Sequence, residues 1–207
     1  MSWLFAQLYE RGSRKQKTGP IDGWRHELLA QAAGEVVEIG AGNGLNLKHY
    51  TDAVTRLVLT EPNQHMRAHL RTRLQVPDGA EVELSEGYAE AIPLPDNSVD
   101  TVVSTLVLCS VKSQAAALAE AQRVLRPGGR FLFLEHVGAD DPGKALLQRV
   151  MKPLCGIFAD GCNPTRNTLG AMEAAGFEIE GLQRSQMPGL SGRFAPTIQG
   201  SAKVLDR

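Results

Sequence analysis

The stretch Glu35-Val-Val-Glu-Ile-Gly-Ala-Gly-Asn-Gly44 decides the fold of this chain. Its apolar start predicts a buried strand, its glycines a tight turn, and residues 45–48 the beginning of a helix. Such a turn brings bare backbone against a ligand at the carboxyl ends of strands, although a plain structural turn has the same pattern. Its glycine spacing disfavours a nicotinamide dinucleotide. Glu38, two residues before the first glycine, suits a ligand with an ammonium or sulfonium charge.

Strands and helices alternate along the rest of the chain. Besides the strand at 35–39, strands are predicted at 57–59, 80–85, 99–104, 130–135, 177–183 and 197–204. Helices are predicted at 21–33, 63–74, 113–125, 140–160 with an interruption at Pro153, and 165–175. This alternation implies parallel strands with right-handed crossovers, so we predict an α/β fold, a doubly wound three-layer sandwich. Glycines and prolines in 185–196 predict a hairpin-like connection between the last two strands.

The composition excludes several classes of protein. With 207 residues, 43% of them apolar and 22% charged, the chain fits one globular domain rather than a disordered or coiled-coil protein. Its 22 Lys and Arg residues balance 23 Asp and Glu residues to a net charge of −1, which leaves no field to attract nucleic acid. The sequence contains no secretory leader and no membrane-spanning apolar run, so we expect a soluble, cytoplasmic protein.

The cysteines and histidines give no metal or disulfide pattern. Cys109, Cys155 and Cys162 are too few for a disulfide framework and contain no C-x-x-C pair, so we expect a reducing compartment. His65 and His69 lie four residues apart on a predicted helix, as metal ligands can, but no third ligand is near them in sequence. We therefore predict a solvated helix face there and no metal.

The first 17 residues predict an amphipathic helix followed by basic residues. Such a helix can fold across the mouth of a pocket, which is the interpretation we favour. It can also make weak peripheral contact with an anionic membrane.

A second acidic residue follows the strand predicted at 57–59. Glu61 stands where nucleotide-binding α/β proteins place the carboxylate that accepts both ribose hydroxyls, although a solvated acid at a strand end is the alternative. Pro62, Asn63 and Met66 would then flank an adenine, with Met66 as an adaptable apolar contact.

Four stretches together resemble the motifs of class I S-adenosylmethionine-dependent methyltransferases: Glu38-Ile-Gly-Ala-Gly-Asn-Gly44, Glu61-Pro62, Gly87-Tyr-Ala-Glu-Ala-Ile-Pro-Leu-Pro-Asp-Asn-Ser-Val-Asp100 and Leu125-Arg-Pro-Gly-Gly129. The resemblance implies a Rossmann-like sheet of seven strands with the last antiparallel, a cofactor-binding core over 34–135, and S-adenosyl-L-methionine as cofactor. The cofactor contacts that it implies are Glu38, Gly40, Ala41, Gly42, Gly44, Glu61, Pro62, Met66, Tyr88, Ala89, Glu90, Thr105 and Leu106. Many members carry Asp where Tyr88 stands, which leaves Ala89 and its neighbours to contact the adenine amino group.

Other stretches are similar to the methyltransferase-like seven proteins, alkyl-thiol S-methyltransferases of the endoplasmic reticulum: Ser104-Thr-Leu-Val-Leu-Cys-Ser-Val-Lys112, Glu135-His-Val137, Asp160-Gly-Cys-Asn-Pro-Thr-Arg166 and Pro196-Thr-Ile-Gln-Gly200. This similarity extends over nearly the whole chain after residue 30. The sequence lacks the N-terminal hydrophobic anchor of those proteins, so we do not expect their membrane location. We predict a single domain over 1–207, with a helical cap over 1–33 and a helical insertion over 138–168 that lines the acceptor site.

Methyl transfer from a sulfonium is an in-line displacement, so the protein must align the acceptor and exclude water. A thiol acceptor reacts as the thiolate, which requires a base or a cationic field. We predict His136 as that base or as an acceptor-orienting group, with a structural histidine as the alternative. The remaining predicted acceptor-site residues are Cys109, Asp160, Cys162, Asn163 and Arg166. For Cys109, a small buried apolar residue is the interpretation that we favour over a role in the acceptor site. Arg166 could pair with Asp160 simply to fix its loop.

The function that we predict is methyl transfer to a small acceptor, with a thiol favoured by the resemblance. One alternative acceptor is a quinone precursor or a lipid headgroup, and another possibility is a cofactor-binding regulator without turnover. A small-molecule acceptor is the one partner that we predict, with no nucleic acid and no obligate protein partner.

Overall fold

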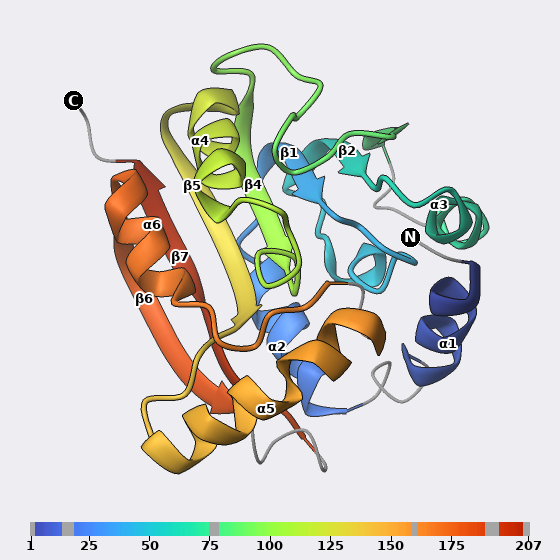
Figure 1. Ribbon diagram of the computed structural model, residues 1–207. Helices are drawn as coiled ribbons and strands as arrows, with labels where there is room; N and C mark the ends of the chain where they lie inside the picture. The colour runs from blue at the N-terminus through green and yellow to red at the C-terminus, as the bar shows by residue number, and fades with distance from the viewer. Residues whose placement is uncertain (1–2, 14–18, 75–78, 159–160, 189–194, 205–207) are drawn as a thin grey trace.

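The computed structural model of the protein describes residues 3–13, 19–74, 79–158, 161–188 and 195–204. Its centre is one seven-stranded sheet with the strand order β3-β2-β1-β4-β5-β7-β6 (Figure 1). The strands are β1 (Gly34–Ile39), β2 (Val54–Thr60), β3 (Glu81–Ser85), β4 (Val99–Thr105), β5 (Leu125–His136), β6 (Phe177–Gln186) and β7 (Pro196–Val204). All pairs from β3 to β5 are parallel, whereas β7 runs antiparallel to β5 and β6. The predicted α/β class and antiparallel last strand are confirmed.

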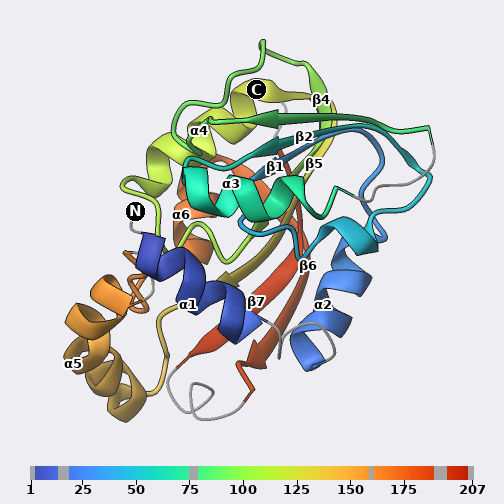
Figure 2. The same cartoon turned by 90° about the vertical axis from the view of Figure 1, so that its right-hand side faces the viewer.

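Helices cover both faces of the sheet. They are α1 (Trp3–Ser13), α2 (Pro20–Leu29), α3 (Gln64–Arg71), α4 (Gln114–Val124), α5 (Pro142–Phe158) and α6 (Thr168–Ala175). Alternate residues of β1 point to opposite faces, so Val37 packs in the cluster that contains α4 and α6 and Val36 packs in the one that contains α2 and α3. Two apolar layers therefore enclose the sheet, as a three-layer sandwich requires (Figures 1 and 2).

Polar caps set the beginnings of three helices. The Asn63 side chain accepts hydrogen bonds from the backbone of His65 and Met66, Ser113 accepts from Ala116, and Asn167 accepts from Gly170. Each helix accordingly begins after the residue that caps it, one to three residues later than predicted. Gly176, in the left-handed conformation, ends α6 where the sequence predicted.

The prediction of a helix directly after the glycine turn is wrong. In its place is a single 3-10 turn, η2 (Leu47–His49). The side chains on either side of this turn are directed into the core, where Asn46 and Tyr50 donate hydrogen bonds to the buried carboxyl group of Glu38. These bonds require Tyr50 to be extended, and a continuing helix would break them.

Two further boundaries differ from the prediction. Strand β5 begins at Leu125 rather than at 130, and the Pro-Gly-Gly sequence makes an irregularity in its pairing with β4 instead of opening it. Helix α5 runs through Pro153 without the predicted interruption. Pro153 and Arg149 are exposed, so water can reach the carbonyl of Arg149, which loses its helical donor.

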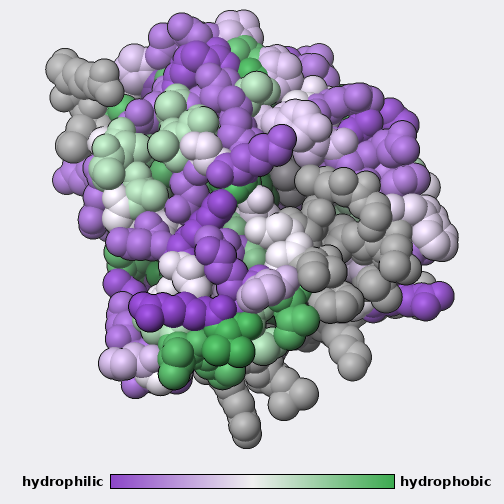
Figure 3. Space-filling model, in the orientation of Figure 1, coloured by the Kyte–Doolittle hydropathy of each residue, from purple (hydrophilic) through white to green (hydrophobic). Residues whose placement is uncertain are grey.

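Helix α5 lies beyond the carboxyl end of β5 and presents apolar residues to solvent (Figures 1 and 3). Leu146, Leu147, Val150 and Leu154 are all exposed, whereas the polar Gln148 is buried and donates a hydrogen bond to the carbonyl of Val137. Within the described ranges, no helix has both the length and the apolar character that crossing a bilayer demands.

Candidate active site

The glycine turn after β1 depends on two glycines for different reasons. Both Gly40 and Gly42 have a positive φ, of +62° and +58°. A Cβ atom on Gly40 would lie 2.6 Å from a methyl carbon of Val107, whereas one on Gly42 would meet nothing closer than the Met66 methyl carbon at 3.7 Å. Because Gly40 has no side chain, the turn can pack against the loop after β4. Because Gly42 has none, open space is left beside the turn at that residue.

Replacing Gly40 with alanine is expected to lower the free energy of unfolding by about 2–4 kcal/mol, because the side chain adds left-handed strain and a clash with Val107. Urea denaturation measures the change. The matched control is Gly156→Ala on α5, where a Cβ would meet nothing within 4 Å. That control is expected to be neutral or stabilising. Equal destabilisation of the two variants would contradict the packing argument.

Glu61 follows β2 and is held by backbone amides. Its two carboxylate oxygens accept hydrogen bonds from the N–H groups of Gly42 and Asn63, each at 2.8 Å. The side chain is buried. The carboxylate is therefore fixed against the glycine turn, at the end of the strand next to β1.

Glu38 is the second carboxyl group of this crevice, and only 1% of its surface is exposed. The hydroxyl of Tyr50 donates to it at 2.7 Å and the amide of Asn46 at 2.8 Å. Burial raises the pKa of Glu38 to about 7. Asn46 also donates to the hydroxyl of Thr105, but its own Oδ1 is buried without a hydrogen-bond partner among the described residues. This corner therefore suits a ligand that carries positive charge and N–H donors.

Helix α1 is fastened to the glycine turn. The amide of Asn43 donates to the side chains of Glu10 and Ser13, at 2.8 and 2.9 Å, and Glu10 forms an ion pair with Arg73. Tyr9, on the same helix, hydrogen-bonds with Arg25. Helix α1 therefore lies beside α3 over the glycine turn (Figure 2).

Arg25 is a buried cation at this crevice, with 2% of its surface exposed. It lies on α2 and acts electrostatically on both Glu38 and Tyr9. Burial raises the pKa of Tyr9, and the charge of Glu61 adds to this effect. The crevice thus combines the buried carboxyl groups of Glu38 and Glu61 with the guanidinium group of Arg25.

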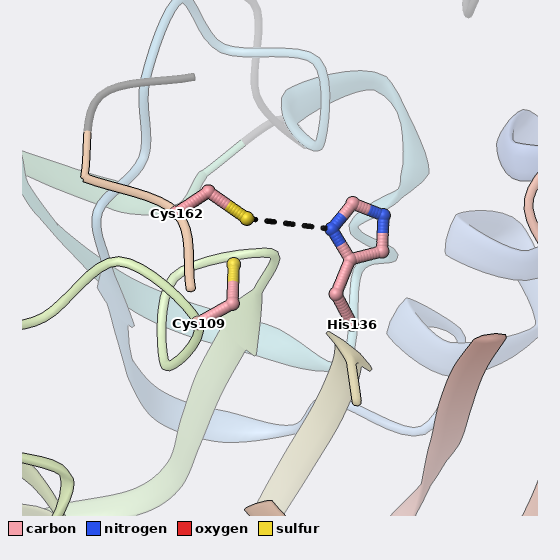
Figure 4. A group of neighbouring side chains, drawn as sticks. All are labelled: Cys109, His136 and Cys162. Carbon is pink, nitrogen blue, oxygen red and sulfur yellow. Dashed lines mark hydrogen bonds between the residues drawn. The ribbon is translucent and has the colours of Figure 1, made fainter. Parts of the chain in front are cut away.

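A second group of side chains meets near the end of β5 (Figure 4). Cys109 comes from the loop after β4, His136 ends β5, and Cys162 follows α5. The sulfur of Cys162 lies 4.0 Å from Nδ1 of His136, and one atom from each of the three residues lies within 4.8 Å of the others. A hydrogen bond with Cys109 lowers the pKa of Cys162.

Two predicted acceptor-site residues hold this group in place. The guanidinium group of Arg166 donates to the carbonyls of Leu108 and Val111, and the backbone N–H of Asn163 donates to the carbonyl of Cys109 at 2.8 Å. The loop after β4 is thereby tied to the segment that contains Cys162. Asp160 lies outside the described residues.

The residues predicted around the adenine differ in their exposure to solvent. Met66 and Ala89 are buried, Pro62 is partly buried, and Tyr88 is 54% exposed. Glu90 accepts hydrogen bonds from the backbone of Lys112 and Ser113, which ties its loop to the start of α4. Leu106 has a left-handed φ of +60°, a strained conformation for a branched residue, directly after Thr105.

A separate hollow of about 250 Å³ lies between the start of α5 and the β6–β7 pair. Asp140, Lys144 and Arg184 are among the residues that line it. Some of its lining residues belong to the predicted insertion over 138–168, but none is among the individually predicted site residues.

Four residues of the crevice were not predicted from the sequence: Tyr9, Arg25, Asn46 and Tyr50. From the sequence, each lies in a segment that can be predicted only to be a helix or a turn. Each reaches the crevice because elements far apart in the sequence pack together. The one available signal was Asn46 itself, a polar residue between Leu45 and Leu47 that proves to be buried.

Comparison with known proteins identifies the family. Residues 37–133 match the family model described as a methyltransferase domain. Human thiol S-methyltransferase TMT1A is 37% identical over 172 residues, which cover 81% of this chain and 69% of the human protein. Rat thiol S-methyltransferase TMT1B is 34% identical over 97% of this chain and 84% of the rat protein. The chain belongs to the thiol S-methyltransferase family.

The fold of this thiol S-methyltransferase family member also matches solved structures. A methyltransferase dependent on S-adenosylmethionine from Thermotoga maritima superposes with a TM-score of 0.67 at 23% identity, over 96% of this chain and 97% of the other. The chain is therefore a class I methyltransferase, and its cofactor is S-adenosylmethionine. The crevice residues fit this cofactor, because Asn46 Oδ1 and the two carboxyl groups suit its cationic and hydroxyl groups, and Gly42 leaves space beside them.

Proposed function

We propose that this enzyme transfers the methyl group of S-adenosylmethionine to the sulfur of a small thiol. The observation that carries the proposal is the group of Cys109, His136 and Cys162, which gathers sulfur and imidazole atoms beside the end of β5. The thiol S-methyltransferases that the chain resembles over most of its length support the same acceptor. No comparable observation favours a quinone precursor or a lipid headgroup.

The cofactor is proposed to lie along the carboxyl ends of β1, β2 and β4. Glu61 accepts hydrogen bonds from the ribose hydroxyls, and Glu38 with Asn46 receives the ammonium end of the methionine part. Arg25 pairs with the methionine carboxylate, because it is the buried cation of this corner. The remaining contacts are assigned to Gly40, Ala41, Gly42, Gly44, Pro62, Met66, Tyr88, Ala89, Glu90, Thr105 and Leu106.

The chain's own residues contribute alignment and proton control. The cofactor supplies an activated methyl group, which the acceptor sulfur attacks in line with the bond that breaks. The acceptor reacts as the thiolate, and His136 accepts its proton or orients it, with the sulfur atoms of Cys109 and Cys162 beside the imidazole. Arg166 and Asn163 keep the loop of Cys109 in position, and α1 excludes water from the crevice.

Cofactor binding is expected to release a proton from Glu38. The pKa of this buried carboxyl group is about 7, and a cation beside it favours the ionised form. At about pH 6 the free protein holds the proton and binding releases it, so affinity rises with pH and levels off above about pH 7. Titration calorimetry in buffers of different ionisation enthalpy counts the protons. The Glu38→Gln variant is expected to show no such release, and an unchanged count in that variant would refute the assignment.

The proposed function is tested by incubating the purified protein with methyl-labelled S-adenosylmethionine and separate thiols, phenols, amines, quinone precursors and lipids. Label is expected on sulfur, with one demethylated cofactor formed for each thioether. Label on a carbon, oxygen or nitrogen acceptor would overturn the thiol proposal. No consumption of cofactor with any acceptor would favour a regulator without turnover.

A further inference from the structure

The group of Cys109, His136 and Cys162 has the composition and size of a zinc site. Its three ligand atoms lie within 4.8 Å of one another, and the Cys162 sulfur is 4.0 Å from the imidazole nitrogen. In a tetrahedral zinc site, bonds of about 2.3 Å to sulfur and 2.0 Å to nitrogen place the ligand atoms about 3.5–3.8 Å apart. Small side-chain rotations therefore suffice to bring these atoms around one ion. Among the described residues, this is the one group of three or more such ligands.

We propose that Cys109, His136 and Cys162 bind a zinc ion, and that its fourth position binds the sulfur of the methyl acceptor. The acceptor half of this proposal rests on the thiol acceptor proposed above. Two cysteines and one histidine with an open fourth position are a ligand set found in catalytic zinc sites, whereas structural sites have four protein ligands. Two thiolates balance the charge of the ion, so the site can be buried at low cost.

The surroundings of the three side chains support a buried ion. Cys109 is 2% and Cys162 is 8% exposed. Nε2 of His136 and Oε2 of Glu135 are both buried and have no hydrogen-bond partner among the described residues. The carboxylate of Glu135, the preceding residue of β5, accepts hydrogen bonds from Ser104 and Val107 and does not bond this nitrogen. An imidazole that ligates through Nδ1 therefore gives up no hydrogen bond at Nε2.

The two cysteines are also held together independently of any ion. Arg166 donates to the carbonyls of Leu108 and Val111, on both sides of Cys109. Asn163, next to Cys162, donates its backbone N–H to the carbonyl of Cys109. These bonds join the two cysteine-bearing segments through main-chain atoms, which makes the ligand set preorganised.

The loop after β4 joins the site to the cofactor crevice. This loop carries Cys109, and its Val107 side chain lies so close to the glycine turn that a Cβ atom on Gly40 would be 2.6 Å from it. A sulfur atom held at the fourth position would therefore approach the cofactor from the side of β4 and β5.

The reaction balances with one proton released. The acceptor thiol loses its proton to solvent when its sulfur binds the ion, because zinc stabilises the thiolate. A lone pair of that sulfur forms the new bond to the methyl carbon. The bond from this carbon to the cofactor sulfur breaks, and its electron pair stays on the cofactor, which becomes neutral. The product is an uncharged thioether, a weaker ligand than a thiolate, so it leaves the ion.

Metal analysis of the full chain tests the site without relying on activity. Protein purified without chelator is expected to contain about one zinc ion per chain by inductively coupled plasma mass spectrometry. Cys162→Ser and His136→Asn are expected to lower the zinc content at least about tenfold. Cys155→Ser is the matched control, because Cys155 lies on α5 outside the three-residue group, and it is expected to keep the zinc.

Cobalt substitution of the unaltered protein keeps the test independent of how the variants fold. Thiolate-to-cobalt absorption is expected in the near ultraviolet, and it is expected to change when a small thiol is added but not when the matching alcohol is added. Protein that contains no zinc as isolated and shows no such absorption would overturn the proposal, whether its cysteines are free or joined in a disulfide.

The two proposals fail in different ways. Metal-free protein that still methylates thiols would remove the zinc site and leave the proposed function intact. A different outcome is a protein that contains zinc, methylates no thiol, and has a cobalt absorption that does not change when a thiol is added. That outcome would refute the thiol acceptor and the proposed role of the fourth position.

Discussion

Replacing His136 by alanine is expected to lower the turnover number for thiol methylation by about 100-fold or more, because the acceptor then keeps its proton. The affinity for S-adenosylmethionine is expected to remain nearly unchanged, since His136 lies with the two cysteines at the end of β5 and not at the glycine turn. Steady-state kinetics at saturating cofactor measures the first quantity, and titration calorimetry measures the second.

The control for this variant is His26→Ala, which removes an exposed imidazole from α2. Its turnover number is expected to match that of the unaltered protein. If His136→Ala also retained full turnover with a thiol, neither a base nor a metal ligand at this position would be tenable. Loss of activity together with loss of cofactor binding would point to a folding defect, which thermal denaturation detects.

Replacing Glu61 by alanine is expected to weaken S-adenosylmethionine binding by about 1–3 kcal/mol, through loss of charge-assisted hydrogen bonds to the ribose. The expected dissociation constant is about 5- to 150-fold higher. Calorimetric titration measures it directly. Turnover at saturating cofactor is expected to fall less than the affinity, because this carboxylate lies away from the proposed acceptor group.

Two variants control for structural damage at this position. Glu61→Gln keeps the shape of the side chain and one acceptor oxygen, so it loses the charge and one of the two hydrogen bonds from the N–H groups of Gly42 and Asn63. Thermal denaturation measures how far this variant stays folded. Glu81→Ala removes an exposed acid at the start of β3 and is expected to leave binding unchanged. A folded Glu61→Ala protein with full affinity would exclude the ribose assignment.

The strands of the sheet could be predicted because their signals lie in short stretches of neighbouring residues. Buried strands read as short apolar runs, and the glycine turn marks the boundary after β1. The helix predicted after that turn is wrong because Asn46 and Tyr50 turn inward to Glu38, a tertiary interaction that no helical propensity reflects. The antiparallel β7 followed from the family resemblance rather than from the pattern of residues.

The site was predictable only in part. The sequence indicated Cys109, His136 and Cys162 one at a time, but it gave no metal pattern, because the residues are separated by more than 25 positions and meet only after β4, β5 and α5 are assembled. Arg25 was not predicted for a similar reason. A cationic residue on an amphipathic helix usually faces solvent, and its burial depends on where α2 packs.

The hydrogen bonds between α1 and the glycine turn have a consequence for how this helix behaves. Asn43 belongs to the glycine turn and also donates hydrogen bonds to Glu10 and Ser13 of α1. Ligand binding at the turn and docking of α1 are therefore thermodynamically coupled. A ligand that steadies the turn must also shield the N-terminal segment from digestion. Limited proteolysis near the start of the chain therefore becomes a readout of whether the methyl donor is bound.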